Sequence, residues 1–141
     1  MQVFERYQKQ ILFEPIGNAG QKKLSRSRVG IVGVGAIGSS IAGLCARAGI
    51  GSLLLLDNDR VELANLQRQM LFDETDIGKP KVLCAAEKLV KINSEIEIEA
   101  FNERLTADNF SDLLEHSDLI LDATDNFATR FLINEQALLL R

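Results

Sequence analysis

One segment, residues 29–40, constrains the fold more than any other part of this 141-residue sequence. Its first four residues form the apolar run typical of a buried β-strand, and apolar or small residues then recur at helical spacing from Ala36 onward. Three glycines lie at the junction: Gly33, Gly35 and Gly38. The segment therefore predicts a strand, a tight glycine-rich turn and a helix in immediate succession.

Each of these glycines has a separate physical task in a phosphate-binding turn. Gly33 permits the tight turn, Gly35 lets a phosphate approach the backbone because no Cβ intervenes, and Gly38 lets the helix pack close to the strand. The N–H groups at the helix start, with Ala36 at its first position, and the helix dipole both favour an anion. We interpret the turn as a phosphate-binding site. A glycine-rich turn without a ligand is the alternative.

Composition narrows the class of protein. An apolar fraction of 46% and a net charge of -4 indicate one globular domain. The chain has no basic excess that would favour nucleic acid, and it has no apolar stretch long enough to cross a membrane. Its first residues lack the basic-then-apolar order of a signal peptide. We therefore expect a cytoplasmic protein with neither nucleic acid nor membrane as a partner.

Strands and helices alternate along the chain after residue 27. The predicted strands are 28–34, 52–56, 95–101 and 119–121, and the predicted helices are 36–48, one starting at Lys79-Pro80, 106–115 and one from Asn126 to the end. Such alternation predicts a parallel sheet with right-handed crossovers. In the doubly wound order 3-2-1-4, the all-apolar second strand lies inside and the alternating third strand lies at an edge.

We therefore predict an α/β fold with a Rossmann-like, doubly wound, mainly parallel sheet over residues 28–141. An N-terminal helical arm over residues 1–27 precedes it, with a break at Pro15 and a second short helix near 18–24. The chain stops on the apolar segment 137–140, where a fifth strand would be the natural continuation. We expect it to be the N-terminal part of a longer domain.

Ligands of open parallel sheets bind at the carboxyl ends of the strands, and two aspartates are predicted there. Asp57 follows the second strand, where a carboxylate accepts hydrogen bonds from ribose hydroxyls; the alternative is an ordinary aspartate of the turn 57–59. Asp125 follows the fourth strand, where it is placed to bind Mg²⁺. Alternatively, Asp125 or Thr124 caps the last helix.

Basic residues gather near the same edge of the predicted sheet. Arg68 lies in the irregular polar stretch 58–78, and Lys79 and Lys81 lie at the start of the next helix. A dinucleotide with two phosphates would leave this much positive charge without a purpose, whereas a triphosphate would use it. The alternative for the two lysines is a solvated helix start, although cations are disfavoured at that end of a helix.

Six motifs occur in the order seen in the ThiF/MoeB/HesA family, and together they cover most of the chain. The family comprises bacterial relatives of the ubiquitin-activating E1 enzymes. The motifs are Arg6-Tyr7-Gln8-Lys9-Gln10, Gly33-Val34-Gly35-Ala36-Ile37-Gly38, Asp57-Asn58-Asp59, Asn65-Leu66-Gln67-Arg68-Gln69, Gly78-Lys79-Pro80-Lys81 and Asp122-Ala123-Thr124-Asp125-Asn126. The chain resembles this family, and the Asn65–Gln69 block is far more selective than the glycines.

The resemblance implies an ATP- and Mg²⁺-dependent adenylyltransferase. Its substrate would be the C-terminal glycine of a ubiquitin-like sulfur carrier of the ThiS or MoaD type, in thiamine or molybdopterin biosynthesis. The implied nucleotide-binding residues are Gly33, Gly35, Ala36, Gly38, Asp57, Asp59, Asn65, Arg68, Lys81, Asp125 and Asn126. Among these, Asp57 would hold the ribose, Asn65, Arg68 and Lys81 the phosphates, and Asp125 the metal.

One departure concerns the opening motif. In relatives its second basic residue is an arginine that reaches the ATP site of a neighbouring subunit, which implies a homodimer; here it is Lys9. Lysine keeps the charge but loses the bidentate fork of arginine.

Two other functions stay open at this point. An NAD-dependent dehydrogenase domain explains the glycines and Asp57 but not Arg68 or Lys81, and the chain alone is alternatively a non-catalytic nucleotide-binding or dimerising module.

Overall fold

A computed structural model describes residues 5–140 of the chain. Four parallel strands, β1 (Arg28–Val32), β2 (Ser52–Leu56), β3 (Glu97–Phe101) and β4 (Leu119–Asp122), form one sheet in the order β3-β2-β1-β4. The predicted fold class and strand order are therefore confirmed, with the half-exposed third strand at an edge.

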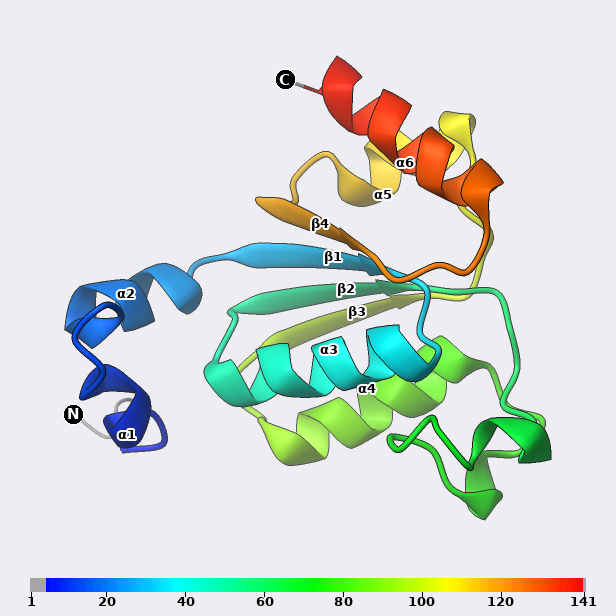
Figure 1. Cartoon of the computed structure of the whole chain (residues 1–141). Coiled ribbons are helices and arrows are strands. Elements are labelled where there is room, and N and C mark those ends of the chain that lie inside the picture. Colours follow the sequence, from blue (N-terminus) through cyan, green and yellow to red (C-terminus); the bar gives the residue numbers. More distant parts are fainter. Residues whose placement is uncertain (1–4, 141) are drawn as a thin grey trace.

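Two pairs of helices cover the two faces of the sheet (Figure 1). Helices α3 (Ala36–Ala48) and α4 (Lys81–Ile92) lie on one face, and α5 (Ala107–Leu114) and α6 (Phe127–Leu139) lie on the other. The sequence predicted α3 and β2 to the residue. Helix α4 begins later than expected because Pro80 is its N-cap residue, with an extended backbone (φ −59°, ψ 131°), rather than part of its first turn. Within residues 5–140, no helix is long and apolar enough to span a membrane.

The run of four leucines in β2, residues 53–56, follows from this arrangement of helices on both faces. Leu53 and Leu55 pack into the core beneath α3 and α4, whereas Leu56 packs into the core beneath α5 and α6. Each face of the strand is covered by helices along residues 53–56, so none of these four positions favours a polar side chain. The second core is anchored by Phe110 of α5 and Ile133 of α6.

The arm, with helices α1 (Gln8–Ile11) and α2 (Gly17–Leu24), lies at the amino ends of the strands (Figure 1). The first four residues of the predicted arm lie outside the described residues. Tyr7 seats its ring against Gly49, where a Cβ would lie about 2.5 Å from the ring, and Gly49 has the positive φ of 81° that ends α3. The arm is therefore packed against the sheet unit.

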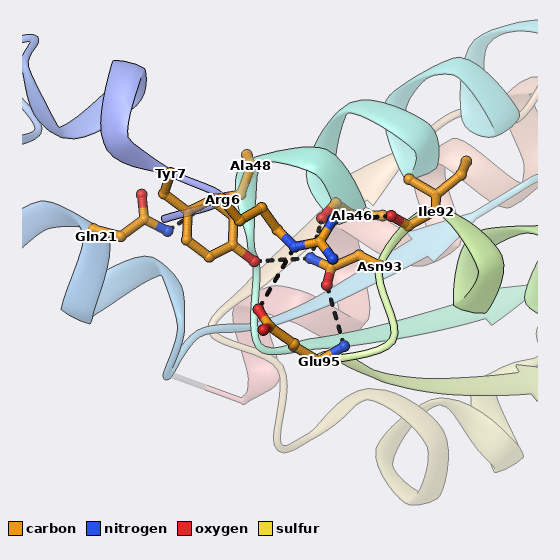
Figure 2. Close-up of polar contacts among 8 residues, drawn as sticks. All are labelled: Arg6, Tyr7, Gln21, Ala46, Ala48, Ile92, Asn93 and Glu95. Carbon is orange, nitrogen blue, oxygen red and sulfur yellow. Dashed lines mark hydrogen bonds and ion pairs between the residues drawn. The ribbon is translucent and has the colours of Figure 1, made fainter. Parts of the chain in front are cut away.

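Hydrogen bonds complete this attachment (Figure 2). Buried Asn93 donates from Nδ2 to the Tyr7 hydroxyl at 2.8 Å and to the Ala46 carbonyl at 2.8 Å, and its Oδ1 accepts from the Glu95 N–H at 3.1 Å. Two further helix carbonyls are bonded by arm side chains. Gln10 and Gln21 donate to Ala48 O at 2.9 and 3.1 Å, and Arg6 donates to Ile92 O at 3.1 Å. The arm thus binds carbonyls at the ends of α3 and α4 that the helices leave unpaired.

Candidate functional site

A cavity of about 640 Å³ lies at the carboxyl ends of the strands, at the end of the sheet opposite the arm. Its walls come from the β1–α3 turn, the connection between β2 and α4, residues 103–105 and the β4–α6 turn. The predicted residues that line it are Gly33, Gly35, Ala36, Asp57, Asp59, Asn65, Arg68, Lys81, Asp125 and Asn126. Four segments separated in sequence therefore meet where strand order reverses.

Gly38 and Lys9 are the predicted site residues that do not line the cavity. Gly38 is buried, and a Cβ there would lie 1.8 Å from the Gly33 carbonyl oxygen, so this glycine allows the helix to approach the turn and has no direct ligand contact. Lys9 is exposed on α1, in the arm at the other end of the sheet. Any action of Lys9 on a nucleotide would therefore have to occur in another copy's cavity.

The glycine turn opens toward the cavity as predicted. Gly33 has a φ of 90°, and Gly35 precedes α3 as an N-cap residue that provides no side-chain hydrogen bond. Helix α4 also begins at the cavity, with Lys81, and also lacks a side-chain cap. By contrast, Thr106 caps α5 and Asn126 caps α6. The N–H groups at the start of α3 are thus left for an anion in this cavity, whereas the Lys81 N–H at the start of α4 donates to the Asp59 carbonyl at 3.0 Å.

Asp57 serves the turn and still lines the cavity. Its Oδ2 accepts a hydrogen bond from the Val34 N–H at 2.7 Å, and its Oδ1 accepts one from the Asp59 N–H at 2.8 Å. These bonds fix the carboxylate in place. Each carboxylate oxygen has two lone pairs, so one acceptor position on each oxygen remains for ribose hydroxyls. The turn alternative and the ligand role are therefore compatible.

Lys81 is 6% exposed and forms an ion pair with Asp59 at 3.5 Å. The alternative of a solvated helix start is therefore wrong for this lysine, although it suits Lys79, which is exposed and does not line the cavity. A buried ammonium at the positive end of a helix is unfavourable unless negative charge lies nearby. Asp59 provides part of that charge, and a bound phosphate would provide more.

The Asn65–Gln69 block forms one wall of the cavity, beginning at the short helix η2 (Leu63–Asn65). Asn65 accepts from the Glu62 N–H through Oδ1 at 2.9 Å, which leaves its side-chain NH₂ as a donor. Exposed Arg68 donates from Nη1 to the Ala64 carbonyl at 3.1 Å. The guanidinium carries five N–H donors, so most of them remain for a ligand.

The sequence reasoning missed Gln69, Arg104 and Arg130 as cavity-lining residues. Gln69 is 4% exposed, and no partner for its Oε1 is found in the part of the chain that the structure describes. Its place in the selective Asn65–Gln69 block was a usable signal. Arg130 donates to the Thr124 carbonyl at 2.7 Å from the second turn of α6. Nothing in the pattern distinguished Arg104 or Arg130 from ordinary surface arginines.

The β4–α6 turn corrects one alternative. Asn126 caps α6, because its Oδ1 accepts from the Thr129 N–H at 2.9 Å. Neither Asp125 nor Thr124 is the cap. Asp125 is exposed at the cavity, so capping does not occupy its carboxylate.

Charges of both signs line the cavity. The basic residues are Arg60, Arg68, Lys81, Arg104 and Arg130, and the acidic ones are Asp57, Asp59, Glu62, Glu103 and Asp125. Five charges of each sign give no net attraction for a polyanion. What this cavity binds must therefore depend on where each charge lies.

Comparison with known proteins shows the family: residues 7–141 match the model of the ThiF family. The chain belongs to the ThiF family. Over 134 residues it is 44% identical to the sulfur carrier protein ThiS adenylyltransferase of Bacillus subtilis, covering 94% of this chain and 40% of that relative. It is 40% identical over 136 residues to the sulfur carrier protein adenylyltransferase of Thermus thermophilus, covering 96% of this chain and 50% of that relative.

A solved structure agrees with the sheet topology. The crystal structure of Escherichia coli MccB with ATP has a TM-score of 0.75 and 34% identity to the chain, over 82% of this chain and 34% of that one. The chain thus spans half or less of the length of these relatives. The family match decides against the dehydrogenase hypothesis.

Proposed function

We propose that the protein adenylates the C-terminal glycine carboxylate of a small ubiquitin-like sulfur carrier, with ATP as co-substrate. The observation that carries this proposal is the presence of Arg68 and Lys81 in the same cavity as Gly35 and Asp125. The names of the relatives support it, because both are adenylyltransferases of sulfur carrier proteins. The carrier would be of the ThiS or MoaD type, and the pathway thiamine or molybdopterin biosynthesis.

We infer that each wall of the cavity would hold a different part of ATP. Asp57, fixed by two backbone N–H groups, would accept hydrogen bonds from the ribose. The start of α3, which has no side-chain cap, would bind phosphate oxygens through backbone N–H groups. Arg68 and Lys81 lie on the walls that would receive the rest of the triphosphate.

The reaction needs no protein nucleophile. An oxygen of the carrier's carboxylate forms a bond to the α-phosphorus, and the bond from that phosphorus to the oxygen bridging to the β-phosphate breaks. Pyrophosphate leaves with the electron pair. Catalysis then consists of alignment and stabilisation of the charge that develops on the phosphates, for which Arg68 and Lys81 are suited.

The cavity fits Mg²⁺ bound together with ATP. In residues 5–140, no three His, Cys, Asp or Glu side chains cluster in a way that could hold a metal ion by themselves. Mg²⁺ usually takes one or two carboxylates and completes its shell with phosphate oxygens and water. Asp125, exposed at the cavity and not used as a cap, would be that carboxylate. When bound, the metal would neutralise part of the phosphate charge.

A second copy of the chain would complete the site. Lys9 is exposed on an arm that is fixed at the amino end of its own sheet, so it cannot serve its own cavity while the arm stays docked. Helix α3 also exposes two apolar side chains two turns apart, Ile37 and Leu44, a surface suited to pairing with another copy. Lys9 would then add positive charge to the partner's phosphates.

Pyrophosphate exchange tests the proposal. The full-length protein is incubated with ATP, Mg²⁺ and labelled pyrophosphate, with a ThiS-type or a MoaD-type carrier ending in Gly-Gly. We expect label to enter ATP with one of these carriers and none to enter with a carrier lacking the last glycine. Failure with both carriers would refute the function and leave a non-catalytic module.

Asp125→Ala tests the metal role. We expect this substitution to abolish pyrophosphate exchange. The melting temperature should stay within about 1 °C of wild type, because an exposed side chain that does not cap a helix contributes little to stability. Asp112→Ala, an exposed aspartate of α5, is the matched control and should leave exchange unchanged. Full activity of the Asp125 variant would remove the proposed role.

A further inference from the structure

The connection between β2 and α4, residues 57–80, carries Arg68, and α4 holds this connection near both of its ends. Lys81 and Lys88 are seven residues apart on α4, which is two helical turns and therefore the same face. Lys81 pairs with Asp59 near the start of the connection. Lys88 pairs with Asp73 and Asp76 in its second half.

The Lys88 cluster is compact and partly buried. The ammonium lies 2.5 Å from Asp76 Oδ2, and the side chains of Lys88 and Asp76 are 22% and 7% exposed. The same Asp76 oxygen accepts from the Asp73 N–H at 2.9 Å, and Asp73 Oδ1 accepts from the Thr75 N–H at 2.9 Å. Lys88 therefore neutralises a buried carboxylate and joins both ends of the short helix η3 (Glu74–Asp76) to α4.

The pKa directions agree with this geometry. The hydrogen bond from Lys88, followed by those from Thr75, holds the pKa of Asp73 well below its usual range. Partial burial of Lys88 disfavours its charge, but the hydrogen bonds to Asp73 and Asp76 outweigh that effect and raise its pKa.

A short, tightly bonded stretch links this cluster to the cavity. The Gln69 carbonyl accepts from the Phe72 N–H at 3.0 Å, and Phe72 is buried in the core directly before Asp73. The N–H groups of Arg68 and Gln69 both bond to the Asn65 carbonyl, at 3.1 and 2.9 Å. A displacement at Asp73 would therefore be transmitted to the backbone of Arg68.

We propose that Lys88 is a positioning residue: by holding Asp73 and Asp76 against α4, it fixes the backbone that presents Arg68 to the nucleotide. The expected effect of Lys88 on activity rests on the proposed adenylation, whereas its effect on the backbone of Arg68 does not. Lys88 does not line the cavity and touches no reacting atom, so it acts through the connection.

A double-mutant cycle in the full-length protein tests the coupling. Lys88→Met is measured alone and in an Arg68→Ala background, with kcat/KM for ATP in pyrophosphate exchange as the readout. We expect about a tenfold loss in the first case and less than about twofold in the second, because the two residues act on one interaction. Lys88→Arg, which keeps the charge, should recover most of the loss. Lys91→Met, an exposed lysine one turn further along α4, is the matched control and should change nothing.

Equal losses in both backgrounds would show a general structural role and overturn the proposal. If Lys88→Met does not fold, Asp73→Asn replaces it, because this change removes one partner of Lys88 and keeps an acceptor for the Thr75 N–H. The cycle is then repeated with that variant and judged by the same criterion.

Amide hydrogen exchange separates this proposal from the proposed function. In Lys88→Met, the amides of Arg68 and Gln69 should exchange at least about fivefold faster, while those of α3 stay unchanged. Unchanged exchange at these two amides would overturn the positioning role whatever the activity. A wild-type protein that exchanges no pyrophosphate would refute adenylation and leave the amide data to decide on Lys88.

Discussion

Two buried amide side chains at opposite ends of the sheet show how the ends of this molecule differ. Asn93, at the amino end, is 0% exposed and forms three hydrogen bonds, two as a donor and one as an acceptor. Gln69, at the carboxyl end, is 4% exposed, and its Oε1 has no partner within residues 5–140. The two groups are alike in chemistry and burial, but only one is satisfied by the chain itself.

The unpartnered oxygen of Gln69 is informative because Gln69 lines the cavity: a buried polar group without a partner costs about 1–3 kcal/mol, and a ligand or water there would complete it. Three buried polar atoms at the amino end, Arg28 Nε, Ser52 Oγ and Ser117 Oγ, also lack a partner within residues 5–140, but they do not line this cavity. The amino end is closed by the arm, which bonds to carbonyls at the ends of α3 and α4. The carboxyl end keeps the start of α3 without a side-chain cap and a buried ammonium beside a cavity. Function and stability are thus separated along the strand axis.

The largest expected effect is on catalysis at the carboxyl end. Arg68→Ala should raise the barrier for pyrophosphate exchange by about 2–4 kcal/mol, because it removes a cation from charge that develops in the transition state. The melting temperature should stay unchanged, since both Arg68 and its hydrogen bond to the Ala64 carbonyl are exposed to solvent. Arg47→Ala, an exposed arginine at the end of α3, is the control. If Arg68→Ala slows pyrophosphate exchange no more than Arg47→Ala does, the proposed difference between the two ends of the sheet is wrong.

The opposite pattern is expected at the amino end. Asn93→Ala should lower the free energy of unfolding by about 2–3 kcal/mol, because the buried Tyr7 hydroxyl and the part-buried Glu95 N–H lose their bonds to Asn93, and the Ala46 carbonyl keeps only the longer bond from the Gly49 N–H at 3.2 Å. Urea denaturation measures this loss. ATP affinity, measured by calorimetry on the folded variant, should change less than about twofold. A large loss of affinity without destabilisation would show that the two ends are not separate.

These two ends also differ in how far the sequence predicts them. Hydrophobic periodicity specifies the sheet, α3 and β2, and the glycine spacing places the turn between β1 and α3, since both depend on neighbours along the chain. The bond between Tyr7 and Asn93 joins residues 86 positions apart, and no local pattern indicates it. Capping of α6 is similar: three consecutive residues, Thr124, Asp125 and Asn126, suit the role, and only the path of the backbone selects Asn126.

The connection of residues 57–80 is the part that sequence reasoning described least. It has no repeating apolar period, so its course is set by particular pairs, such as Lys81 with Asp59 and Lys88 with Asp76. Burial of Lys81 and Gln69 follows from these pairs, and composition alone assigns lysine and glutamine to the surface.

A third substitution compares the two amides directly. Gln69→Met replaces the amide with an apolar side chain of similar size and removes the unpartnered oxygen. We expect the free energy of unfolding to stay the same or to rise by up to about 1 kcal/mol, because a buried polar group without a partner is lost. ATP affinity should fall about tenfold if the amide bonds to the nucleotide. Destabilisation comparable to that of Asn93→Ala would show that Gln69 is satisfied within the protein.

The smallest effect is expected from acid, and it too should differ between the ends. The pKa of Asp73 is lowered in the folded protein, by the hydrogen bond from Lys88 and then by those from Thr75. Its contribution to stability is therefore present above the unfolded pKa of about 3.9 and is lost as the pH falls below it. The pKa of Lys88 is raised, so its contribution is present below about pH 10.4 and is lost only at higher pH.

Between about pH 5 and 10, protection of the Arg68 and Gln69 amides, corrected for intrinsic exchange, should thus be constant. Below about pH 4 the protection of these two amides should fall in the wild type. The Lys88→Met variant should lack this decline, because Asp73 and Asp76 have already lost the ammonium that pairs with them. The amides of α3 near Ala46 should keep their protection over the same range, since the bond from Asn93 to the Ala46 carbonyl involves no ionisable group. Earlier loss at the amino end would reverse the contrast between the two ends of the sheet.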